Sequence, residues 1–212
     1  MCGVLYFRGD GNRYKGLVIR VLEQSRIRGL HAFGVSLRSS SKEEFQTVRT
    51  FDLPAAIEFI RENTFSELIG HCRYDTSGDW KIINNNQPIV LGQSLLAFNG
   101  VVRMSTREEY QQEFQREYTT ENDGEIILRM LVEEDRRLMS LLEQKRVTFA
   151  GVAHVNNKAM ALRNERRPLW RALSMDVEFV FSTYDIWSRA IQSTEFYYLS
   201  ALDIPPMEPV WL

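Results

Sequence analysis

The chain has 212 residues, of which 44% are hydrophobic and 25% charged, a composition typical of a globular protein with one domain of generous size. Its net charge of −2 argues against nucleic acid or an anionic membrane as a partner. The two cysteines exclude a disulfide framework and a zinc site, so we expect no metal, no cofactor and a cytoplasmic location. The charged first residues and the lack of a long apolar run predict neither a signal peptide nor a membrane span.

The first third of the chain is predicted to alternate strands with two helices. Turn-forming residues over 8–12 separate the first strand from the first helix. Arg28-Gly29 ends this helix, because glycine commonly follows a helix end, and Pro54 opens the second, because the first turn of a helix does not need its N–H. Strands are expected over 3–7, 31–38, 45–51 and 67–73, and helices over 14–27 and 54–63.

The remaining two thirds begin with a polar, turn-rich segment over 74–88, which we expect to be a functional loop. A strand over 94–98 then ends at Asn99-Gly100. Helices are expected over 106–118 and 123–144, and strands over 147–155, 157–163, 178–183 and 195–200. Because strands and helices do not alternate regularly, this order predicts an α+β fold with largely antiparallel sheets, and we expect a single domain over 1–212.

Cys2 is the first candidate for chemistry, because removal of Met1 would place its thiol beside a free α-amine. A terminal amine titrates near neutral pH, so its neutral form can act as a base. A thiol is in turn a strong nucleophile, and the pair has the parts needed to attack an amide carbonyl. The alternative is that Cys2 is a small apolar residue at the start of a strand.

Asn99-Gly100 is a candidate for the group that stabilises the oxyanion formed by such an attack. The asparagine side chain and the glycine N–H would supply two hydrogen-bond donors, and glycine lets the backbone approach a substrate closely. The same dipeptide is also a common hairpin turn, here between strands over 94–98 and 101–103. The two interpretations are compatible, because a turn can carry the donors.

Arg73 and Asp123 are candidates for binding an amino-acid substrate. A guanidinium matches a carboxylate, so Arg73 could bind the α-carboxylate, and Asp123 could bind the α-ammonium. Their alternatives are a surface arginine at a strand end and an N-cap of the helix that follows.

Six motifs occur in an order that resembles the glutaminase domain of class II glutamine amidotransferases, which are N-terminal nucleophile hydrolases. They cover about residues 2–200, and the family includes glucosamine-6-phosphate synthase and glutamine phosphoribosylpyrophosphate amidotransferase. The resemblance implies a four-layer αββα sandwich of two antiparallel sheets. The motifs are Cys2-Gly3, Arg28-Gly29-x-His31-Ala32-x-Gly34, Gly70-His71-x-Arg73-Tyr74-x-Thr76-x-Gly78, Asn85-x-Gln87-Pro88, Phe98-Asn99-Gly100-Val101-Val102 and Asn122-Asp123-x-Glu125.

The resemblance also implies roles for the residues that carry the chemistry. Cys2 is expected to be the nucleophile, with its freed α-amine as the general base, acting through a water molecule. Asn99 and Gly100 are expected to form the oxyanion hole. Arg28 corresponds to an arginine near the nucleophile, to which we assign a supporting role.

For the substrate, the resemblance implies that Arg73 binds the α-carboxylate of glutamine and that Asp123 binds its α-ammonium. Thr76 and Ser77 fall on the loop that closes over glutamine. The chain departs from the family pattern at Asp75, where a small residue is common, and at Ser77, where histidine is common. Both differences bear on how the loop closes and on substrate specificity.

The expected activity is hydrolysis of the glutamine side-chain amide through a thioester on Cys2. Because no synthase segment follows within 212 residues, we expect the ammonia to pass to a synthase on a separate chain. One alternative is a stand-alone amidohydrolase of a γ-glutamyl compound, and another is a catalytically silent, partner-binding protein. The expected partners are therefore L-glutamine or a γ-glutamyl substrate and a synthase, with no nucleic acid and no membrane.

Overall fold

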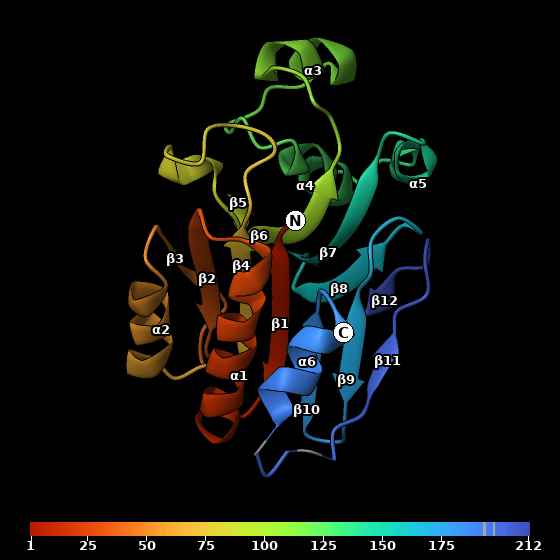
Figure 1. The fold of residues 1–212 in the computed structure, drawn as a ribbon. Coiled ribbons are helices and arrows are strands. Elements are labelled where there is room, and N and C mark those ends of the chain that lie inside the picture. The colour runs from red at the N-terminus through yellow and green to blue at the C-terminus, as the bar shows by residue number, and fades with distance from the viewer. Residues whose placement is uncertain (193, 197) are drawn as a thin grey trace.

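The computed structural model describes residues 1–192, 194–196 and 198–212. Within these residues, two antiparallel sheets stack face to face and helices cover both outer faces, as Figure 1 shows. The predicted α+β fold, a four-layer αββα sandwich, is therefore confirmed. None of the helices in the described part of the chain has the length and apolar character needed to cross a membrane.

In the described residues, the larger sheet has seven strands with β1 at its centre. β1 pairs antiparallel with β10 on one side and with β4 on the other. In spatial order the strands are β11 (Ala201–Asp203), β9 (Trp170–Leu173), β10 (Val177–Phe181), β1 (Gly3–Gly9), β4 (Glu67–Arg73), β2 (Ala32–Arg38) and β3 (Gln46–Thr50).

The smaller sheet has five strands over the same described ranges. Its central pairs, β8 with β7 and β7 with β6, are antiparallel. In spatial order the strands are β12 (Val210–Trp211), β8 (Lys158–Arg163), β7 (Thr148–Val155), β6 (Ser94–Val101) and β5 (Ile89–Leu91).

The helices divide between the two outer faces, and each set buries an apolar core against its sheet. The helices on the larger sheet are α1 (Gly11–Ser25), α2 (Leu53–Glu62) and α6 (Tyr184–Ile191), and those on the smaller sheet are α3 (Arg107–Phe114), α4 (Gly124–Val132) and α5 (Arg137–Glu143). Two short 3₁₀ turns, η1 (Arg26–Arg28) and η2 (Ile83–Asn85), lie in the connections.

The alternation of side chains along β1 decides which residues face the space between the sheets. Val4 and Tyr6 belong to the core between the sheets, whereas Leu5 and Phe7 belong to the core under the helices. Because side chains alternate along a strand, Cys2 shares the face of Val4 and points between the sheets. The fold therefore directs the thiol toward the smaller sheet.

The prediction of one helix over 123–144 was wrong, because the chain forms α4 and α5 with a break between them. Glu134 has a φ of +53°, a left-handed conformation that a continuous helix does not allow. The Asp135 carboxylate then accepts a hydrogen bond from the Arg137 N–H at 2.9 Å, where α5 begins.

The elements β5, β9, α6 and β12 were not predicted, and α3 ends at Phe114 rather than at residue 118. Two further differences lie toward the ends of the chain. α1 begins at Gly11, inside the predicted turn, because the Asp10 side chain accepts hydrogen bonds from the N–H groups of Asn12 and Arg13. No strand forms over the described part of 195–200, where residue 197 lies outside the described residues; β11 begins at Ala201 instead.

His71 links the two sheets from β4. Its ring Nε2 lies 3.1 Å from the Phe98 carbonyl oxygen on β6. A carbonyl oxygen only accepts hydrogen bonds, so Nε2 carries a proton. Burial, with the nearby Arg73 charge, lowers the pKa of His71 to about 3.

This buried histidine predicts acid sensitivity of the fold. The unfolded chain takes up a proton at His71 below its ordinary pKa of about 6.5, whereas the folded chain does not, so the free energy of unfolding decreases as the pH falls. Between pH 7 and pH 5 we expect the wild-type protein to lose about 1–2 kcal/mol more than a His71→Gln variant does. Urea unfolding at both pH values measures the difference, and equal losses in the two proteins would contradict the prediction.

Candidate active site

Cys2 lies at the N-terminal end of the central strand β1, close to β6 of the other sheet (Figure 1). Only 5% of the residue is exposed. The Arg28 Nε–H donates to the Cys2 carbonyl oxygen at 2.8 Å, so η1 holds the start of the strand. The predicted supporting residue therefore contacts the backbone of Cys2.

The Cys2 thiol lies against the backbone of Tyr74, which follows β4. Its Sγ is 3.3 Å from the Tyr74 carbonyl oxygen and accepts a hydrogen bond from the Tyr74 N–H at 3.4 Å. Burial raises the pKa of the Cys2 thiol, whereas the Tyr74 N–H and the charges of Arg73 and Arg28 act in the opposite direction. A thiol with a raised pKa needs a base before it can attack a carbonyl.

Asn99 lies next to Cys2 although the two are far apart in sequence. The Cys2 N–H donates to the Asn99 Oδ1 at 2.9 Å, and after loss of Met1 this nitrogen would be the α-amine. The Asn99 Nδ2 is buried and has no hydrogen-bond partner among the described residues. A buried donor without an acceptor is costly, so this atom is available to a bound group.

Gly100 continues β6 rather than turning the chain. β6 pairs with β7 from Leu95 to Val101, so the hairpin predicted as an alternative for Asn99-Gly100 does not form. A Cβ on Gly100 would lie 1.9 Å from the Thr148 carbonyl oxygen of β7, so only glycine fits there. The structure thus holds Asn99 on a paired strand.

Arg73 is buried at the end of β4, with 2% of the residue exposed, so the alternative of a surface arginine was wrong. Its guanidinium binds groups of the loop over 74–88. One terminal nitrogen contacts the Asn85 carbonyl and the Asn86 Oδ1, and the other contacts the Asp75 Oδ1 at 2.7 Å and two loop carbonyls. Arg73 therefore organises the loop that leads away from the thiol.

Asp123 is buried at the start of α4, but its side chain does not cap the helix. Its Oδ2 accepts hydrogen bonds from the Val102 and Arg103 N–H groups, and its Oδ1 accepts one from the Ser77 hydroxyl at 2.7 Å. Burial raises the pKa of the Asp123 carboxyl, and these hydrogen bonds oppose the shift. Asp123 thereby ties the segment after β6 to the loop that carries Ser77.

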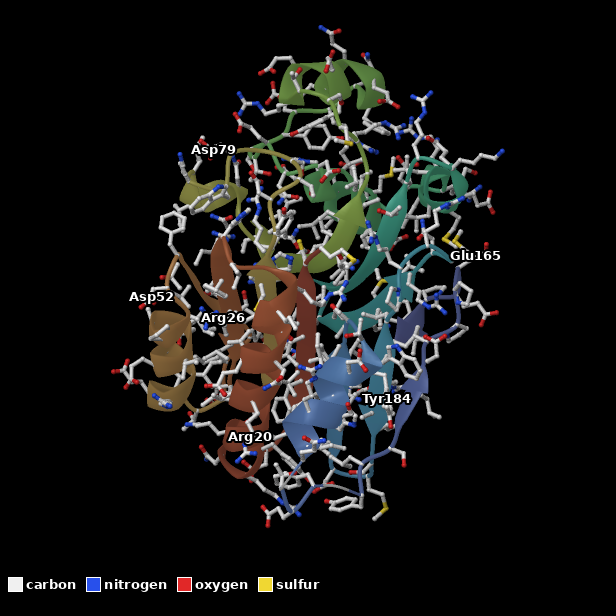
Figure 2. The ribbon with its side chains drawn as sticks, viewed as in Figure 1. Arg20, Arg26, Asp52, Asp79, Glu165 and Tyr184 are labelled. Atoms are coloured by element: carbon white, nitrogen blue, oxygen red, sulfur yellow. The ribbon has the colours of Figure 1, made fainter. Side chains whose placement is uncertain are left out.

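The loop over 74–88 carries the two remaining predicted residues, and Ser77 contacts Asp123. Thr76 is exposed on it. Asp79, labelled in Figure 2, is also exposed on this loop. Of the predicted site residues, the structure thus places Asn99 and Arg28 in hydrogen-bond contact with Cys2, and Ser77 in contact with Asp123.

His31 is a part of the site for which the sequence predicted no contact with the loop. Its ring stacks on Tyr74 and on Trp80, with centroid distances of 5.0 and 5.2 Å. Its Nδ1 accepts a hydrogen bond from the Asp75 N–H at 3.0 Å. The aromatic residues in the predicted loop were the only sequence signal for this stack.

The sequence matches no protein-family model and no curated protein, but the structure resembles solved ones. Glutamine phosphoribosylpyrophosphate amidotransferase of B. subtilis, solved with ADP and GMP, gives a TM-score of 0.72 at 16% identity, over 97% of this chain and 46% of that one. A structure of the allosteric regulatory enzyme of purine biosynthesis gives 0.71 at 19%, over 97% and 45%. A glutamine aminotransferase class-II domain protein of Silicibacter pomeroyi gives 0.57 at 15%, over 85% and 88%.

The chain spans less than half the length of the first two of these structures. At such low identities the comparison concerns the fold, and it agrees with the two stacked antiparallel sheets and their helical layers. The chain therefore has the fold of these glutamine amidotransferase structures.

Proposed function

We propose that the chain, once Met1 is removed, is a glutamine amidotransferase that hydrolyses a side-chain carboxamide through a thioester on Cys2. Cys2 is the nucleophile and its α-amine the general base, acting through a water molecule. Asn99 and Gly100 donate to the oxyanion, and Arg28 holds the backbone of Cys2. The part of the site that binds the substrate is formed by Thr76, Ser77, Arg73 and Asp123.

In the first half of the proposed reaction, the neutral α-amine accepts the thiol proton and the sulfur attacks the carboxamide carbon. The tetrahedral oxyanion accepts hydrogen bonds, then collapses, and ammonia leaves with the proton that the amine returns. In the second half, water attacks the thioester with the same amine as base, and the carboxylic acid and the free thiol are released.

The arrangement of the Asn99 side chain carries the proposal. Its Oδ1 accepts a hydrogen bond from the Cys2 nitrogen, and its Nδ2 is buried without an acceptor among the described residues. One amide group thus orients the nitrogen of the expected base and offers a donor beside the nucleophile. Burial raises the pKa of the Cys2 thiol, so the proposed mechanism needs the α-amine as its base.

Hydrolysis of a γ-glutamyl compound rather than free glutamine stays a prediction from the sequence. A synthase on a separate chain as the acceptor of the ammonia stays a prediction from the sequence. A cytoplasmic location also stays a prediction, in keeping with two buried free thiols.

The test is an assay of protein whose loss of Met1 has been verified by mass spectrometry. We expect ammonia release from a glutaminyl carboxamide and labelling of Cys2 by a glutamine analogue with a diazoketone in place of the carboxamide. If the processed protein releases no ammonia from any glutaminyl carboxamide and Cys2 is not labelled, the catalytically silent alternative replaces the proposal.

A further inference from the structure

The Arg73 guanidinium has no pair of donors left for a substrate carboxylate. Its terminal nitrogens carry four hydrogens, and these face acceptors from Asp75, Ser77, Gly78, Asn85 and Asn86. A carboxylate recognises arginine best through two parallel N–H groups. To bind in this way, a free α-carboxylate must displace a group that the chain itself supplies.

Among these acceptors, Asp75 contacts Arg73 through a carboxylate, the same group that a free amino-acid substrate would present. Its Oδ1 lies 2.7 Å from the arginine terminal nitrogen, and it is the member of the set that carries a negative charge. The other acceptors are backbone carbonyls and an asparagine amide. A substrate carboxylate at this position would therefore meet both competition for Arg73 and repulsion from Asp75.

The backbone around Asp75 is held in place. The Asp75 N–H donates to the His31 Nδ1 at 3.0 Å, and the His31 ring stacks on Tyr74 and on Trp80. Further along the loop, the Ser77 hydroxyl donates to the Asp123 carboxylate at 2.7 Å. The Asp75 carboxylate thus contacts Arg73 from a loop whose conformation is fixed by these hydrogen bonds and ring contacts.

The second carboxylate oxygen of Asp75 is free to accept a hydrogen bond. It receives no hydrogen bond from the residues that the structure describes, and 29% of the side chain is exposed. An ionised carboxylate accepts hydrogen bonds and does not donate them. An amide N–H next to the α-carbon of a substrate would complement this oxygen, whereas a free carboxylate would not.

We propose that Asp75 is the specificity-determining residue of the site and selects glutaminyl substrates whose α-carboxyl group is masked in an amide bond, as in the N-terminal glutamine of a peptide. The inference rests on the proposed function and narrows its substrate class. Free glutamine is then a poor substrate because it must displace Asp75 from Arg73.

The test compares L-glutamine with its α-methylamide, which differs only in the masked α-carboxyl group. Ammonia reports the side-chain reaction for both compounds, because loss of the α-methylamide would release methylamine. A hydrogen bond between charged groups is worth a factor of about ten to one hundred, so we expect the wild-type kcat/KM to favour the α-methylamide by at least about tenfold. A wild-type preference for free glutamine would overturn the inference without the use of any variant.

Asp75→Asn is the informative variant, because it keeps an oxygen for Arg73 and removes the charge. We expect the KM for L-glutamine to fall by about tenfold, and the kinetics of the α-methylamide to change by less than about threefold. Asp79→Asn is the matched control, since it removes an exposed carboxylate on the same loop and should leave the preference unchanged. If Asp75→Asn changes both substrates equally, Asp75 has only a structural role and the inference fails.

Calorimetric binding in a Cys2→Ala background separates this inference from the proposed function. Suppose that the protein with Cys2 intact hydrolyses neither compound, but that in the Cys2→Ala background Asp75→Asn tightens the binding of glutamine by about tenfold relative to the α-methylamide. The selectivity then stands and the catalytic proposal falls. If hydrolysis occurs and the preference is the same with and without Asp75, the catalytic proposal stands and the selectivity falls.

Discussion

Replacing Cys2 with alanine is expected to abolish release of ammonia from the side-chain amide, with a fall in kcat of at least about 10⁴-fold. The thiol supplies the bond-forming atom, and the neighbouring groups of the site cannot replace it. Substrate binding should persist, because alanine removes only the sulfur from a residue whose backbone is held by Arg28 and Asn99. Steady-state kinetics and calorimetric binding together measure the two effects.

Cys72→Ala is the matched control, because Cys72 is the other buried cysteine of the chain. Its side chain lies on the face of β4 that packs against the helices, where the Sγ donates to the Leu22 carbonyl oxygen at 3.6 Å. Burial raises the pKa of this thiol. We expect this variant to lose some stability and to keep its kcat. Substantial turnover in Cys2→Ala would contradict the proposed mechanism.

A companion variant separates the thiol from the amine. An alanine inserted between Met1 and Cys2 keeps the thiol but leaves the Cys2 nitrogen in a peptide bond, where it is not basic. The inserted protein should be as inactive as Cys2→Ala if the α-amine is the base. Full activity after insertion would assign the base to another group.

Asn99→Asp is expected to lower kcat by about 10²–10³-fold, with a smaller change in KM. Aspartate keeps the shape of the side chain and an oxygen for the Cys2 nitrogen, but it loses the Nδ2 donor and adds a negative charge where the oxyanion would form. The loss therefore concerns the transition state more than the bound substrate. Steady-state kinetics on protein that has lost Met1 measure the changes in kcat and in KM separately.

Asn164→Asp is the control for this substitution. The Asn164 Nδ2 is also buried, but it donates to the carbonyl oxygens of Leu142 and Val147 and so has a structural role. Its loss should lower the free energy of unfolding by about 1–3 kcal/mol and leave kcat unchanged in the folded protein. Equal kcat losses in the two variants would show that the Asn99 effect is structural, which would remove the main support for the oxyanion hole.

The four-layer fold could be predicted because its signals are local or lie in the order of the motifs. β4 has the bounds that were predicted, since a short apolar run leads into a polar loop at Arg73. The residue types made Cys2 and Asn99 candidates for one site, and the family resemblance strengthened that prediction, but neither segment alone indicates that two residues so far apart in sequence are in contact.

The sequence could not predict that the Arg73 guanidinium is already bound by other groups of the chain. Whether Arg73 is open to a substrate depends on how the loop folds back. This depends on the contact that Asn85 makes from the far end of the loop and on the one that His31 makes from another segment. The break between α4 and α5 was also missed, because the charged residues over 133–137 include no glycine or proline to mark a helix end, and the helix stops where Glu134 takes a positive φ. Side-chain partners over such separations are a property of the assembled fold.

The position of β1 has a consequence for how the protein loses its activity on heating. A chain end usually frays independently of the domain behind it, because little holds it in place. Here the residue after Cys2 already belongs to a strand that is paired along both edges, so local fraying would have to break the centre of the sheet. Cys2 is therefore expected to keep its position until the whole domain unfolds, so that heat inactivation and loss of the fold would coincide.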